Sequence, residues 1–235
     1  MLVWLMVCFG SVFAPASSAA GSCQPAELFA TDNTWVITGS DAKATGQLHG
    51  DLEPFERQAV VTIAQTGAEV RGSTLVDGVF WSATLQQIAY ERARQFHLCV
   101  VDEPTLHTAA EAMNRQFHQE TALTFEYLPQ GAPRADAMLI AVPGIDLARF
   151  GDALTADSAA RQRLLGGSIT TADRTLLLVA ANRDLDIARH LVEQAGGSWT
   201  AATINYGRRE LVQTYPPWLR SMSEPRPWRH FGARP

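Results

Sequence analysis

Five side chains that could line a ligand site alternate along two neighbouring segments of the chain. Segments 70–82 and 87–101 are rich in β-branched and aromatic residues, and the short stretch between them predicts a β-hairpin. A turn at 83–86 would place Asp77 opposite Arg92 across the two strands. One face of the hairpin would then present an acid, two arginines and two aromatic rings: Asp77, Trp81, Tyr90, Arg92 and Arg94.

The chemistry that this face predicts is the binding of a small anionic or aromatic ligand, provided that a cavity forms over it. The plainer alternative is an ordinary protein core in which Asp77 and Arg92 form a structural ion pair. The pattern favours this alternative, because a buried charge needs a partner whether or not a ligand exists.

No catalytic motif accompanies this face. The chain lacks GxSxG, GxGxxG, GxxxxGK and HExxH, so serine-nucleophile, dinucleotide, P-loop and zincin chemistry have no support. His107 and His118 lie on one predicted helix but about 16 Å apart, too far to share one metal ion. We expect no metal site and no cofactor, and the sequence leaves open whether the protein is an enzyme.

Charge and composition exclude two further classes. The formal net charge is −5, so a protein that binds nucleic acid by neutralising phosphates is not expected. With 46% hydrophobic and 18% charged residues, the chain is too apolar for a disordered protein and predicts a folded core.

The first 20 residues predict a signal peptide. An apolar run over 2–14 is too short to span a bilayer, and Ser18-Ala19-Ala20 offers small residues for cleavage before Gly21. The segment before the apolar run carries no Lys or Arg, so a different start codon is the alternative. The predicted location is secreted or associated with the cell envelope; a start further downstream would make the protein cytoplasmic.

The cysteines leave three outcomes open. Cys23 and Cys99 could pair in an oxidising compartment. The apolar run around Cys99 instead favours a buried free thiol. Lipidation of Cys23 would attach the protein to the envelope, and the Arg-rich tail could also contact envelope polymers or lipid headgroups.

Behind the signal peptide, strand-like and helix-like segments occur twice in the order β-α-β-β-α-β. The segment 28–38 predicts a strand, and the segment 90–96 alternates apolar and charged residues, which also favours a strand. The segments 146–165 and 184–195 predict helices, the second capped by Asp184. The predicted fold class is α+β: two tandem ferredoxin-like units with antiparallel sheets that could pack sheet to sheet. The domains would be 27–129 and 136–213, followed by a Pro/Arg-rich tail at 214–235.

Three stretches, GSTLVDGVFWS, YERARQFHL and QFHQETALTFEYLP, resemble a small exported bacterial domain family of uncharacterised function. The resemblance covers about residues 27–128, with its anchors at Phe117, Gln119, Glu120, Leu123 and Phe125. It implies the β-α-β-β-α-β plan and an envelope or extracellular setting, and it implies no activity.

These observations predict an exported or envelope-associated binding protein with no assignable catalysis. The alternative is a small-ligand-binding protein or enzyme that uses an aromatic and Arg-lined cavity between the two sheets. No partner is indicated beyond such a small anionic or aromatic ligand.

Replacing Leu5 and Val7 by Asp should block secretion of a reporter fused behind residues 1–25, because charge inside the apolar run prevents its recognition as a signal. Reporter activity in the culture medium measures the effect. Unchanged secretion would contradict the signal peptide.

Overall fold

The computed structural model describes residues 23–31, 37–38, 53–83, 85–100, 102–118 and 121–213. The predicted signal peptide and the Arg-rich tail lie outside these residues. Among the helices described, none combines the length and the apolar character needed to cross a bilayer.

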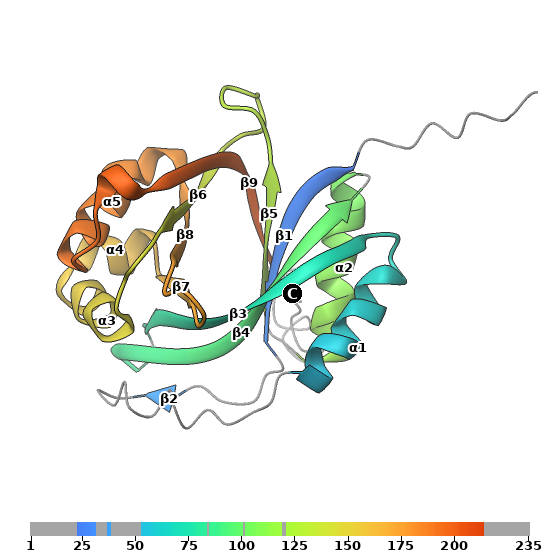
Figure 1. Ribbon diagram of the computed structural model, residues 1–235, viewed down its shortest axis with the longest axis horizontal. Helices are drawn as coiled ribbons and strands as arrows, with labels where there is room; N and C mark the ends of the chain where they lie inside the picture. The colour runs from blue at the N-terminus through green and yellow to red at the C-terminus, as the bar shows by residue number, and fades with distance from the viewer. Residues whose placement is uncertain are drawn as a thin grey trace, which may run out of the picture.

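Eight antiparallel strands close into a single barrel (Figure 1). The order around it is β1-β5-β9-β6-β8-β7-β3-β4, and β4 pairs again with β1; the short β2 extends the edge of β4. The strands are β1 (Gln24–Ala30), β2 (Ile37–Thr38), β3 (Glu69–Ser82), β4 (Gln87–Val100), β5 (Thr121–Tyr127), β6 (Ala137–Val142), β7 (Gly166–Thr170), β8 (Leu176–Ala181) and β9 (Thr203–Gln213).

Helices cover two opposite sides of the barrel (Figure 1). Helices α1 (Glu53–Ala64) and α2 (Glu103–Gln116) pack on one side; α3 (Leu147–Ala156), α4 (Ser158–Arg163) and α5 (Leu185–Gln194) pack on the other. The long strands β3 and β4 cross from one helical layer to the other. Short 3₁₀ turns stand at Asn182–Asp184 and Trp199–Ala201.

The predicted fold class, two ferredoxin-like units whose sheets could pack face to face, is wrong. The strands of both halves join edge to edge, through β5 with β9 and through β3 with β7. This pairing satisfies the backbone groups that two separate sheets would leave open along their outer strands.

Two glycines permit these junctions. A Cβ atom on Gly207 would press against the carbonyl oxygen of Glu126, and one on Gly166 against that of Val79. Each glycine lies where a strand of one half meets a strand of the other, at a separation that leaves no room for a side chain.

Most predicted elements are present, with three differences. The predicted helix 146–165 is two helices, because Asp157 ends α3 and caps α4 by accepting from the N–H groups of Ala159 and Ala160. The predicted strand 28–38 is replaced by β1 and the short β2. The expected cap of α5 by the Asp184 side chain is not made.

Three apolar clusters define which side chains face inward. One cluster consists only of strand residues and fills the barrel: Val76, Phe125, Ala137, Leu139 and Leu177. The two others contain helix residues, including Phe55 of α1 and Phe150 of α3, and therefore lie outside it. Because side chains alternate along a strand, these clusters assign every second residue to the interior.

Candidate functional site

The five residues predicted from the sequence lie on the outer face of β3 and β4. The predicted hairpin register is confirmed: Asp77 pairs with Arg92 and Val79 with Tyr90. Both Val79 and Tyr90 belong to the core under α3, outside the barrel. In the described part of the chain the strands form one sheet, so the expected cavity between two stacked sheets does not form.

Within the described part of the chain, one pair from this set forms a salt bridge. Nε of Arg92 donates to Oδ1 of Asp77 at 2.9 Å. The guanidinium carbon of Arg161, on α4, lies 4.6 Å from the centre of the Trp81 ring.

The remaining two, Tyr90 and Arg94, contact different helices. Burial, helped by the charge of Asp152, raises the pKa of Tyr90, which lies against Gly151 of α3. Arg94 donates to Ser73 at 2.8 Å and pairs with Glu56 of α1 at 3.0 Å. Ligand binding by these five residues stays a prediction.

A different polar group lies inside the barrel, around the carboxylate of Glu27. Oε2 of Glu27 accepts from Nδ1 of His97 at 2.8 Å and from Nε2 of Gln95 at 3.2 Å, and Oε1 accepts from the Tyr127 hydroxyl at 2.9 Å. On the other side of the imidazole, Nε2 of His97 lies 3.0 Å from Oγ1 of Thr74. We call these five residues the Glu27 cluster.

Strand register places this cluster. Glu27 of β1 lies directly opposite His97 of β4, and both face the barrel interior with Phe29 and Ala93. Tyr127 is on β5, which flanks β1 on its other side. The cluster therefore spans β3, β4, β1 and β5.

The cluster combines a buried acid with an accessible base. The Glu27 side chain is 8% exposed, whereas that of His97 is 40% exposed. Gly72 lies opposite His97 across the β3–β4 ladder, and a Cβ there would lie 3.9 Å from the imidazole Cδ2. The absence of a side chain at Gly72 leaves this edge of the ring uncovered.

The buried carboxylate and burial itself both shift the pKa values of the neighbouring side chains. Its hydrogen bond raises the pKa of His97, and its charge adds to this rise, while burial acts in the opposite direction. Burial, together with the charge of Glu27, raises the pKa of the Tyr127 hydroxyl far above its ordinary value of 10.0. Tyr127 thus remains a hydrogen-bond donor across the physiological pH range.

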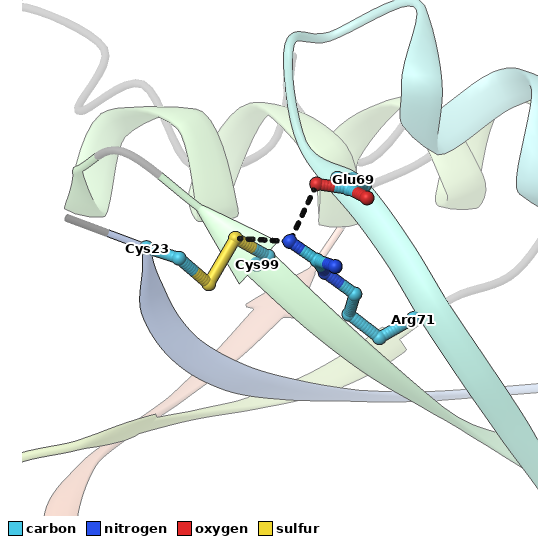
Figure 2. Close-up of a disulfide and its surroundings, with 4 residues drawn as sticks. All are labelled: Cys23, Glu69, Arg71 and Cys99. Carbon is cyan, nitrogen blue, oxygen red and sulfur yellow. Dashed lines mark hydrogen bonds and ion pairs between the residues drawn. A yellow bond between two sulfur atoms is a disulfide. The ribbon is translucent and has the colours of Figure 1, made fainter. Parts of the chain in front are cut away.

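A disulfide closes the barrel beside the cluster (Figure 2). It joins Cys23, just before β1, to Cys99, two residues beyond His97 on the same strand. The expected free thiol at Cys99 is therefore wrong: the apolar neighbours Leu98 and Val100 face the helices, and Cys99 faces the other way. The sulfur atom that a lipid on Cys23 would need is bonded to Cys99.

A bulge in β3 lies next to the disulfide. The register shifts between Val70 and Gly72, and Arg71 is the additional residue. Its guanidinium pairs with Glu69 at 3.0 Å and approaches the Cys99 sulfur to 3.8 Å (Figure 2). Arg71 is exposed, and Glu69 balances its positive charge at this end of the barrel.

The Glu27 cluster was missed at the sequence level, because the histidines were considered only as metal ligands. Among the described residues no three His, Cys, Asp or Glu side chains converge as a metal site. The available signal was the alternation in β4, where Gln95 and His97 share the face opposite to that of Phe96 and Leu98, together with an acid inside the apolar strand β1.

Other predicted polar residues have structural partners. Asp102 caps α2 by accepting from the backbone N–H of Thr105 at 3.0 Å, a common role for Asp at a helix start. His107 pairs with Glu210 at 3.0 Å and Glu111 at 3.3 Å. His118 lies beyond the end of α2.

Comparison with known proteins identifies no family. No family model matches the chain, and no curated protein matches it, so the resemblance to an exported bacterial family stays an expectation. A "putative monooxygenase" from Lactobacillus acidophilus is 11% identical, with 81% of this chain and 96% of that chain covered, at a TM-score of 0.27. A second, from Fusobacterium nucleatum, is 8% identical, with 82% and 95% covered, at a TM-score of 0.24. Similarities this weak carry no argument about fold or activity.

The free energy of unfolding should depend on pH through His97. Its pKa in the folded protein lies above the ordinary value of 6.5, so the stabilising pair with Glu27 is complete below about pH 6.5 and is lost as pH rises through the folded-state pKa. The wild type should therefore exceed His97→Gln in stability by more at about pH 5.5 than at about pH 8.5. Between these two pH values the stability difference should change by less than about 1 kcal/mol, because the His97 side chain is 40% exposed.

Urea unfolding at both pH values measures this difference. His107, whose pKa Glu210 raises, is present in both proteins and cancels. A stability difference that grew with pH would contradict the His97–Glu27 pair.

Proposed function

We propose that this chain is an exported binding protein that holds a small carboxylate ligand at His97 and Thr74, at the end of the barrel. The observation that carries the proposal is the Glu27 cluster: a buried carboxylate with three donors, beside an imidazole that remains 40% exposed. Removing a carboxylate from water is costly, and perturbed titratable groups gather at functional sites more often than elsewhere.

Charge and access favour a small anion. His97 has a raised pKa, so part of the population carries a positive charge near neutral pH. Three donors stabilise the carboxylate of Glu27, and His97 offsets its charge when the imidazole is protonated. Gly72 leaves the imidazole edge open to a ligand of modest size.

The disulfide supports export. The chain contains the Cys23–Cys99 disulfide. Disulfide bonds persist in secreted and envelope proteins and are rare in a reducing cytosol. The bond also fits the predicted signal peptide, whose cleavage before Gly21 would leave Cys23 close to the new N-terminus.

Titration of the purified mature chain with benzoate, followed by ¹H–¹⁵N NMR, tests the binding site. Saturable shifts should appear at Gly72, Thr74 and His97. His97→Gln should weaken binding about tenfold, the effect of losing a charge-assisted hydrogen bond. Gly72→Val should weaken it similarly by covering the imidazole, without removing any polar group.

Two matched variants serve as controls. His190→Gln changes an exposed histidine on α5, and Arg92→Ala removes the acid–arginine pair of the outer face. Both should bind benzoate as the wild type does. The absence of saturable shifts, or loss of binding in Arg92→Ala with full binding in His97→Gln, would refute the proposed site.

A further inference from the structure

Building on the proposed carboxylate site, we propose that Thr74, His97 and Glu27 form a nucleophile–base–acid relay that hydrolyses small esters. The small carboxylate ligand of the proposed binding site would then be the product of this reaction. The order in which the three side chains contact one another defines the relay.

The hydrogen bonds fix that order. Glu27 accepts from Nδ1 of His97 at 2.8 Å, so the neutral ring carries its proton on Nδ1 and leaves Nε2 free to accept. Oγ1 of Thr74 lies 3.0 Å from this Nε2. A hydroxyl, an imidazole and a buried carboxylate in this sequence are the arrangement by which hydrolases on unrelated folds activate a nucleophile.

Side chains from the strands on both sides of β1 hold the Glu27 carboxylate in place. Tyr127 of β5 donates to one oxygen, and Gln95 donates to the other beside His97. Glu27 is therefore a positioning residue, which orients the imidazole and stabilises its positive charge when a proton arrives.

Access distinguishes this group from a closed structural network. Thr74 is partly exposed, and His97 is 40% exposed beside the bare backbone of Gly72. A small ester can therefore approach the hydroxyl from the barrel end, whereas the carboxylate of Glu27 stays shielded from water.

The reaction balances with water as the co-reactant. Thr74 Oγ1 attacks the ester carbonyl carbon as its proton moves to His97 Nε2. The ester C–O bond breaks, and the alcohol leaves with the proton from His97. Water then attacks the acyl-Thr74 ester, giving its proton to Nε2; the carboxylic acid leaves and Thr74 recovers its hydroxyl proton.

The test is hydrolysis of p-nitrophenyl acetate by the disulfide-bonded mature chain. Release of p-nitrophenolate should fall about 100-fold in Thr74→Val and in His97→Gln, the lower range for loss of general base catalysis. Thr74→Ser should retain activity, since it keeps the hydroxyl. His190→Gln controls for direct attack by an exposed imidazole and should equal the wild type.

Two further measurements assign the roles. Peptide mass spectrometry after rapid acid quenching should find the acetyl group on Thr74. Glu27→Gln should lower the rate and move the rise of the pH–rate profile to lower pH, because the hydrogen bond from His97 to Glu27 is the main cause of the raised His97 pKa.

The outcomes separate the two proposals. If benzoate binds at His97 but hydrolysis does not exceed that of the Thr74→Val and His97→Gln variants, the relay is refuted and the binding site stands. An acetyl group found only on residues other than Thr74 also refutes the relay. If benzoate binding is absent as well, both proposals fall. Thermal unfolding of each variant confirms that loss of activity is not loss of fold.

Discussion

The pairing of β1 with β4 is the constraint on which the rest of the structure depends. It joins the first strand of the barrel to the eighth, so the ring of strands closes. The same register sets Glu27 opposite His97, and the Cys23–Cys99 bond lies two residues further along β4. A slip of one residue would turn Glu27 outward into the apolar core under α1 and α2, where it would have to displace Leu28.

The barrel interior has an apolar middle and a polar end. Its middle is filled by strand side chains such as Phe125 and Leu139, which are almost completely buried. Its end holds a partly buried acid–base pair, and hydrophobic residues of similar volume can often replace such a pair as a whole without loss of stability. The cost of burying the Glu27 charge is offset by three donors, and the resulting geometry leaves one imidazole nitrogen facing a hydroxyl at the surface. This arrangement favours a site over a purely structural network.

The sequence predicted local structure well and the assembly of strands poorly. Alternation through Tyr90–Phe96 correctly indicated a strand, and counting from the turn gave the pairing of Asp77 with Arg92. A period of two separates the faces of a strand but does not say which one is inward. In β4 the more apolar face packs under the helices, and His97 lies on the other face. A search for candidate residues on the apolar face therefore did not include His97. Closure depends on which strand edges meet, at positions such as Gly166 and Gly207, and this information is not periodic.

The central claim, that Glu27 orients His97 toward Thr74, is tested most directly by the tautomer of the imidazole. Long-range ¹H–¹⁵N NMR correlations of the side-chain nitrogens, recorded where His97 is neutral, distinguish the two forms. If Glu27 accepts from Nδ1, the neutral ring carries its proton on Nδ1 and Nε2 has none. A neutral ring protonated on Nε2 would leave Nδ1 without a proton to donate, and would contradict the orientation from which the site is built.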